Sequence, residues 1–148
     1  MNRKRINRWT AVSGHPSETQ LRSISLSDYK SVLNIRVKGE GEQPIPPTRE
    51  EVMAKNLGLV YRLLELSGVT LTEGDIERFR SAVADLPRPI LIHGSNQETL
   101  EAIAVIDAGI EAGWSGDQAI ERAGAIGVAW ESPSIRDLVK SGVDRYLS

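Results

Sequence analysis

Apolar and polar positions follow two different periods along this chain. Short apolar runs, typical of strands buried on both faces, occur at 9–13, 32–37, 59–64 and 90–92. Between these runs, apolar residues recur at helical spacing, most clearly over 72–86. Strands that alternate with helices predict an α/β fold with three layers: a mostly parallel sheet of about four to five strands, with helices on both faces.

Helix starts are predicted by capping boxes, in which Ser or Thr is followed three residues later by Glu or Gln. The pairs are Ser17 with Gln20, Thr48 with Glu51, Ser95 with Glu98, and Ser115 with Gln118. A helix is also expected to begin at Thr72 and another at Ser132-Pro133. If Ser95 and Glu98 cap their helix, their oxygens occupy the amide groups that a bound anion needs.

The length of 148 residues fits one domain, which we place at 9–148 behind a basic N-terminal arm at 1–8. The chain has no cysteine, which excludes disulfides and thiol chemistry. No apolar run is long enough to span a bilayer, and no apolar segment follows the basic N-terminus as a signal peptide requires. We therefore expect a cytoplasmic protein. Two histidines without a carboxylate cluster at ligand spacing predict no metal site, and no cofactor is expected.

The turn after the run at 90–92 is the candidate site. A strand that leads through a tight turn into a helix directs the first helical N–H groups at one point, where an anion or a reactive group can bind. The residues of this loop are His93, Gly94, Ser95, Asn96, Gln97, Glu98 and Thr99.

This loop resembles H-C-x-x-G-x-R, the signature of cysteine-dependent phosphatases, and specifically of the beta-lactamase-hydrolase-like branch. Further likenesses lie at 11–17, 31–36 and 112–115, so the resemblance runs from about Trp9 to Val128. In that family the cysteine thiolate attacks phosphorus, while loop amides and the arginine hold the phosphate oxygens. Here the three corresponding positions are Gly94, Gln97 and Thr99.

The resemblance together with these substitutions predicts a catalytically inactive phosphatase-like domain. We expect it to act by binding, as a regulatory or structural subunit of a protein assembly. The alternative is a hydrolase on the same scaffold that uses a non-cysteine nucleophile such as Ser95. We favour a structural His93 and a capping Ser95 over a catalytic pair. His15 in its Gly-His-Pro turn is expected at the surface, and Glu65 is expected in a loop.

The N-terminal arm is the candidate partner-binding segment. Its cations are Arg3, Lys4, Arg5 and Arg8, and Trp9 closes it. The arm contains four cations and no acid, while the whole chain has a net charge of −2. This uneven distribution of charge favours oriented docking of the arm on an acidic surface. We expect a protein partner or a larger complex. Nucleic acid is a weaker alternative as the partner. If the arm has no function, it is a solvated tail.

Overall fold

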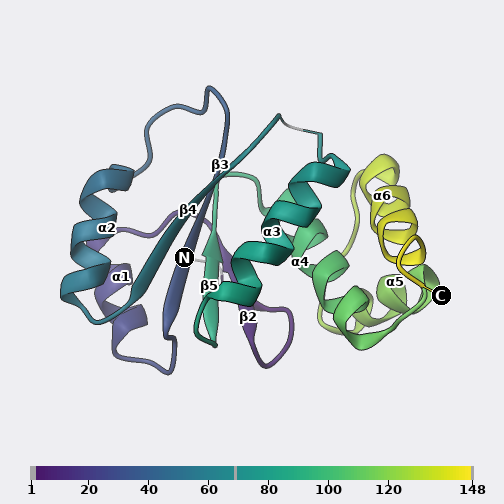
Figure 1. Cartoon of the computed structure of the whole chain (residues 1–148), viewed down its shortest axis with the longest axis horizontal. Helices are drawn as coiled ribbons and strands as arrows, with labels where there is room; N and C mark the ends of the chain where they lie inside the picture. The colour runs from purple at the N-terminus through teal and green to yellow at the C-terminus, as the bar shows by residue number, and fades with distance from the viewer. Residues whose placement is uncertain (1–2, 69, 148) are drawn as a thin grey trace.

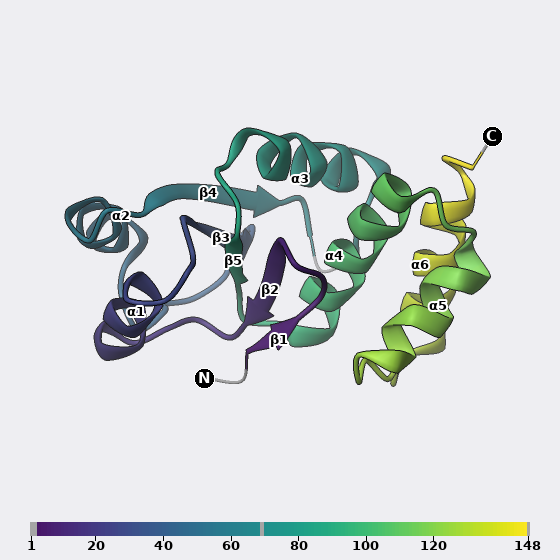
Figure 2. The ribbon, with the colours of Figure 1, turned by 90° about the horizontal axis from the view of Figure 1, so that it is seen from below.

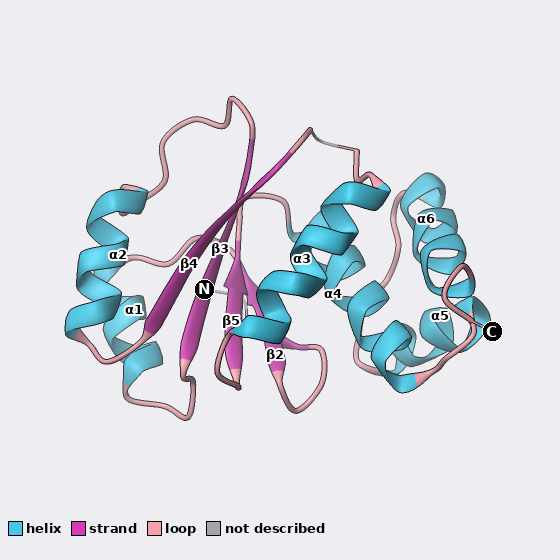
Figure 3. Ribbon diagram, in the orientation of Figure 1, coloured by secondary structure: helices cyan, strands magenta, loops and turns pink. Residues whose placement is uncertain are grey.

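A computed structural model describes residues 3–68 and 70–147, and within these ranges the chain forms one five-stranded sheet in the order β1-β2-β5-β3-β4 (Figures 1 and 3). The strands are β1 (Lys4–Arg5), β2 (Thr10–Ser13), β3 (Ser31–Val37), β4 (Val60–Leu66) and β5 (Ile90–His93). All neighbouring pairs are parallel except β1 with β2. The central strand β5 is buried along its whole length, as its apolar run predicts.

Six helices flank the sheet in the part of the chain that the structure describes. They are α1 (Glu18–Ser25), α2 (Pro47–Asn56), α3 (Glu73–Asp85), α4 (Gln97–Ala112), α5 (Gly116–Ala125) and α6 (Pro133–Asp144). Figure 2 shows the sheet between α1 and α2 on one side and α3 and α4 on the other, with α5 and α6 outside α4. The predicted three-layer α/β fold is therefore confirmed.

Each face of the sheet has its own apolar core. Val32 and Leu91 pack with the buried residues of α1 and α2, among them Leu21. The larger core lies on the other face, where Leu33 and Ile92 pack with residues of α3, α4, α5 and α6. Alternate residues along β3 and β5 thus enter opposite cores, as the two-residue period of a strand requires.

The capping signals are correct at α1 and α5, where Ser17 and Ser115 accept the predicted amide bonds. Thr72 also caps α3, with Asp75 as its capping-box partner. The prediction for α2 is wrong, because this helix begins at Pro47 and has no side-chain cap. Proline at the first helical position needs no hydrogen bond to its nitrogen and favours a helical φ, so it starts the helix without help from Thr48.

Glu65 lies within β4 and not in the loop that follows it. Among the described helices, none combines the length and the apolar character that crossing a bilayer would need.

Candidate functional site

The loop between β5 and α4 lies at the carboxyl end of the sheet, as predicted. His93 ends β5, and it faces Ser13 at the end of β2 and Asn34 within β3. Carboxyl ends of parallel strands are where such folds place their sites. The loop is tight, because only Gly94, Ser95 and Asn96 separate the strand from Gln97, the first residue of α4.

The predicted capping box of Ser95 and Glu98 is wrong, because Asn96 caps α4. The Asn96 side chain accepts the Thr99 amide hydrogen at 3.1 Å. Ser95 instead donates its hydroxyl to Glu40 at 3.0 Å, and the Glu98 carboxylate accepts two amide hydrogens from Glu131 and Ser132. Both Ser and Asn are strong N-cap residues, so the choice depends on where the helix begins rather than on residue type.

Gly94, which the resemblance matches to the family's nucleophile, has no space for a side chain. A Cβ atom there would lie 2.9 Å from the carbonyl oxygen of Ile35 and 3.1 Å from Cδ2 of Leu100. The first contact is with backbone of the neighbouring strand β3, which no rotamer change can relieve. A cysteine at this position therefore requires the loop or β3 to shift.

The cavity beside the loop is small. The cavity bounded by Ile35, Glu40, Ser95, Asn96 and Thr99 measures about 10 Å³. A single water molecule needs roughly 10–15 Å³ measured in this way. A phosphate group is much larger than a water molecule, so this cavity does not accommodate one.

The carboxylate of Glu40 lies over the loop where an anion would otherwise bind. Its Oε1 accepts the Ser95 hydroxyl and, at 3.2 Å, the Val37 amide hydrogen. Its Oε2 lies 2.9 Å from Nε2 of His15 and 3.3 Å from Nη1 of Arg36. Burial raises the pKa of Glu40, but hydrogen bonds from His15, Val37 and Ser95 outweigh it and leave the pKa below its ordinary value. The Glu40 carboxylate thus places a negative charge of the domain itself beside the loop.

His15 is not the surface residue that its turn suggested. Its side chain is only 8% exposed, and its Nδ1 lies 2.8 Å from Nδ1 of His93. His93 is fully buried, and its Nε2 lies 2.5 Å from Oε2 of Glu50 on α2. Four side chains therefore form one continuous Glu–His–His–Glu chain from the core to the loop, in the order Glu50, His93, His15 and Glu40.

The three hydrogen bonds of this chain require one proton more than two neutral imidazoles supply. Burial is the main reason that the pKa of His15 is below its ordinary value of 6.5, so His15 is neutral at pH 7. A neutral His15 that donates Nε2–H to ionised Glu40 must accept a hydrogen from Nδ1 of His93. On the far side of His93, Asn34 and Gln43 donate to the other oxygen of Glu50.

Sequence reasoning identified His93 but missed Glu40 and Glu50. Glu40 lies in a loop rich in glycine and acids, and Glu50 lies in the first turn of α2, a common place for an acid. Only the tertiary fold brings them to the histidines. In the ranges that the structure describes, no group of three or more His, Asp or Glu side chains has the arrangement of a metal site.

The predicted arm is paired with the sheet at Lys4 and Arg5, and Met1 and Asn2 lie outside the described residues. Lys4 and Arg5 form β1, and Lys4 binds Glu101 at 2.9 Å and the carbonyl oxygen of Gly127 at 3.0 Å. Arg3 and Arg5 lie over the ring of Tyr29, with guanidinium carbons 5.5 and 5.4 Å from its centroid.

Trp9 remains accessible beside these cations, with 40% of its surface exposed. Arg8 and Arg88 lie 5.3 and 5.7 Å from its ring centroid. Trp9 and Arg88 precede β2 and β5, so this group lies at the opposite end of the sheet from the loop. We call it the amino-edge patch, and it consists of Arg3, Arg5, Arg8, Trp9, Tyr29 and Arg88.

Comparison with known proteins supports the resemblance. The chain is 32% identical over 90 residues to a beta-lactamase hydrolase-like protein of Xylella fastidiosa, covering 60% of this chain and 20% of that protein. A beta-lactamase hydrolase-like protein of Agrobacterium fabrum is 34% identical over 95 residues, covering 63% of this chain and 22% of that protein. The chain thus spans about a fifth of the length of these relatives. No family model matches it.

Solved structures show the same fold. A phosphatase-like protein of Neisseria meningitidis superposes with a TM-score of 0.75 at 17% identity, covering 94% of this chain and 96% of that one. The core catalytic domain of the S. cerevisiae PP-IP phosphatase SIW14 gives a TM-score of 0.70 at 15% identity, over 94% and 83% of the two chains. The predicted similarity to beta-lactamase-hydrolase-like proteins and the predicted phosphatase-like fold are confirmed.

Proposed function

We propose that this relative of the beta-lactamase hydrolase-like proteins, with its cysteine-dependent phosphatase fold, is a non-catalytic domain that acts by binding a protein partner. The observation that carries this proposal is the closed loop at Gly94. The chain contains no cysteine, the nucleophile position has no room for a side chain, and the cavity over the loop is about 10 Å³. Phosphoryl transfer by the family's chemistry needs the space as well as the nucleophile.

The loop also lacks the means to hold a phosphate dianion. The family's arginine position is Thr99, which is buried and whose amide hydrogen is used by Asn96. The nearby Arg36 is engaged by the Glu40 carboxylate, the Gln43 side chain and two loop carbonyls. A second anion placed beside Glu40 would be repelled.

We place the partner contact at the amino-edge patch. Trp9 is an exposed aromatic side chain with an arginine on its ring, and Trp and Arg are the residues most enriched at the centres of protein interfaces. Four arginines of the patch favour an acidic protein surface. Their attraction extends over about 8 Å at physiological ionic strength, so association should weaken as salt rises.

The catalytic half of the proposal is tested with p-nitrophenyl phosphate and phosphotyrosine peptides. We expect no turnover above buffer from the repurified protein. Gly94→Cys with Thr99→Arg restores two signature residues, and we expect no rescue because the Ile35 carbonyl and Glu40 still occupy the site. Efficient hydrolysis by the parent chain would overturn the proposal.

The binding half is tested by affinity capture from the source cells with the full chain as bait. Arg8→Glu with Arg88→Glu should lose the captured partner at physiological salt, and Trp9→Ala should lose it as well. Lys55→Glu with Arg136→Glu makes the same change of charge at exposed positions on α2 and α6 and serves as the matched control. Equal capture by the patch and control variants would refute this placement.

A hydrolase that uses Ser95 is the second candidate, and one observation favours it. The Ser95 hydroxyl donates to the Glu40 carboxylate, so Glu40 is placed to take the hydroxyl proton as a general base. The alternative predicts ester hydrolysis that disappears in Ser95→Ala and also in Glu40→Gln. Panels of p-nitrophenyl carboxylate esters are the direct assay.

A further inference from the structure

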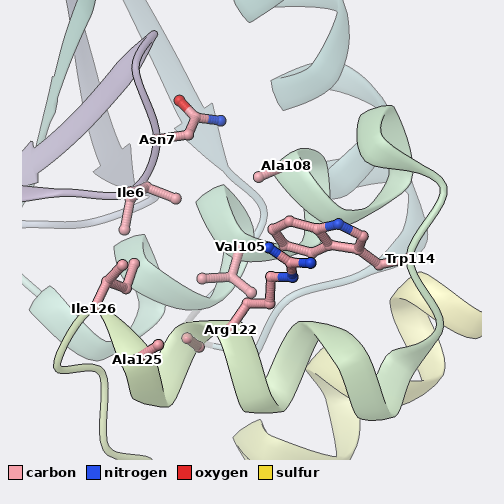
Figure 4. A pocket seen from close by; sticks show the side chains of 9 residues that line it. Ile6, Asn7, Val105, Ala108, Trp114, Arg122, Ala125 and Ile126 are labelled. Atoms are coloured by element: carbon pink, nitrogen blue, oxygen red, sulfur yellow. The ribbon is translucent and has the colours of Figure 1, made fainter.

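A pocket far from the loop lies between the turn that joins β1 to β2 and the helices α4 and α5. Its volume is about 270 Å³, and Figure 4 shows the side chains that line it. From this pocket we infer a binding site for a small monocarboxylic acid with an apolar or aromatic body.

The walls of the pocket are apolar and come from three separate elements. Ile6 follows β1, Val105 and Ala108 lie on α4, and Ile126 follows α5. Ile126 is 38% exposed although it is a large aliphatic residue, so a ligand in the pocket would cover it. Burial of apolar surface of this kind is worth about 25 cal/mol per Å² and favours a ligand with a hydrocarbon body.

Arg122 supplies a cation in the pocket without an acidic partner. Its guanidinium carbon lies 5.2 Å from the ring centroid of Trp114, and it makes no salt bridge or hydrogen bond within residues 3–68 and 70–147. Arg80 shows the contrast: it also lies over an aromatic ring, yet it binds Asp107 and Glu111. Stacking on Trp114 orients the Arg122 group while leaving its N–H donors free for a ligand anion.

Asn7 adds donors of a second kind. Its Oδ1 accepts the amide hydrogens of Trp9 and Thr10, both at 2.9 Å, and the Thr10 hydroxyl at 3.0 Å. Two backbone donors to one atom identify that atom as the oxygen, so the other is the NH₂ group. That group has no acceptor in the described chain, and Figure 4 shows it on the side of Ala108.

These features select the ligand class. Among the described residues, two sets of donors and no acidic side chain line the pocket, which suits an anion and excludes an amine. A single guanidinium suits one negative charge. At about 30 Å³ per water molecule, the pocket holds roughly nine waters, so a ligand of about ten non-hydrogen atoms fits. A carboxylate at Arg122 and Asn7, with an apolar body on Ile6 and Val105, meets all these conditions.

The probe is 3-phenylpropionate, titrated into the ¹⁵N-labelled full chain and followed by amide chemical shifts. We expect saturable shifts at Asn7, Ala123 and Ile126, and none in the loop from Gly94 to Thr99. The neutral isostere 3-phenylpropanamide, which keeps the shape and removes the charge, should bind at least about tenfold more weakly, because a hydrogen bond to a charged group is lost.

Two variants locate the carboxylate. Arg122→Gln should weaken 3-phenylpropionate about tenfold or more, while the matched control Arg136→Gln, on the exposed side of α6, should not change it. Asn7→Asp keeps the oxygen that accepts three hydrogen bonds but replaces the free donors with negative charge, so it should abolish binding without unfolding the turn. Equal affinity for acid and amide, an unchanged Asn7→Asp variant, or no saturable shift at Asn7 and Ile126 would each overturn the assignment.

Discussion

The two ends of the sheet differ in how their polar groups are satisfied. At the carboxyl end, Glu40 and Glu50 are hydrogen-bonded to His15, His93, Ser95 and Arg36 inside the domain. At the amino end, the arginines lie on aromatic rings, and Trp9 stays accessible. In a phosphatase the carboxyl end binds the ligand. Here the polar groups at that end are paired within the domain, and we propose that a partner binds at the amino end, where Trp9 is exposed.

The largest effect is expected from breaking the Glu–His–His–Glu chain at its buried end. Glu50→Ala leaves His93 without its carboxylate partner in the core and should cost about 3–5 kcal/mol of the free energy of unfolding. The neighbour Glu51, which is exposed on the same helix, gives the control Glu51→Ala, expected within about 0.5 kcal/mol. Urea denaturation measures both. A loss below 1 kcal/mol for Glu50→Ala would mean that the chain does not stabilise the fold.

A second effect concerns the closed loop itself. Gly94→Ala places a methyl group against the Ile35 carbonyl and should destabilise the domain by about 1–3 kcal/mol, as overpacking does. Gly14→Ala is the matched control, because its Cβ would meet nothing within 4 Å. If both alanine variants melt at the temperature of the parent, the loop has space that the structure does not show.

Acid should lower the free energy of unfolding through two groups at the carboxyl end of the sheet, His15 and Glu40. Above pH 6.5, His15 is neutral in both the folded and the unfolded chain. Below pH 6.5, His15 of the unfolded chain binds a proton, whereas buried His15 in the folded chain stays neutral because its pKa is lowered. The free energy of unfolding therefore falls as the pH falls below 6.5. Glu40, whose pKa is lowered below 4.5, stabilises the fold above that pH and loses this contribution as pH falls further. For each proton, the free energy of unfolding changes by at most about 1.4 kcal/mol per pH unit.

Thermal melts of the parent and of His15→Gln between pH 7.5 and 5 separate the two groups. The parent should lose stability steadily as pH falls below 6.5, and the variant should show a shallower dependence in this range. Parallel curves would indicate that His15 does not titrate differently in the folded chain.

The smallest expected effect shows which residue caps α4, Asn96 or Ser95. Asn96→Ala removes the cap of α4 and should cost about 1 kcal/mol. Ser95 is exposed, and within residues 3–68 and 70–147 its hydroxyl bonds only to Glu40, so Ser95→Ala should stay within about 0.5 kcal/mol. The reverse order in chemical denaturation would restore Ser95 as the capping residue.

How much the sequence predicts depends on how local the interaction is. The strand at 90–92, the place of His93 and the capping boxes at Ser17 and Ser115 follow from short-range patterns, and the structure agrees with them. The cap of α4 is ambiguous because two adjacent residues both suit the position.

The long-range part of the site lies beyond such patterns. A Gly-His-Pro turn suggests exposure, yet β2 and β5 are parallel neighbours, so the turn after β2 brings His15 onto His93. Glu40 and Glu50 are 53 and 43 residues away from His93 in number, and only the sheet order β2-β5-β3 brings them to the histidines. Their residue types alone carry no signal of that proximity.

The central claim is that the loop binds no phosphate because Glu40 and the Ile35 carbonyl already occupy its space. The direct measurement is a titration of the ¹⁵N-labelled chain with tungstate, an oxyanion that mimics phosphate, followed at the amides from Gly94 to Thr99. We predict no saturable shift of these amides at any concentration at which the fold is intact. Saturable shifts confined to this loop, strengthened by Glu40→Gln and competed by inorganic phosphate, would contradict the account.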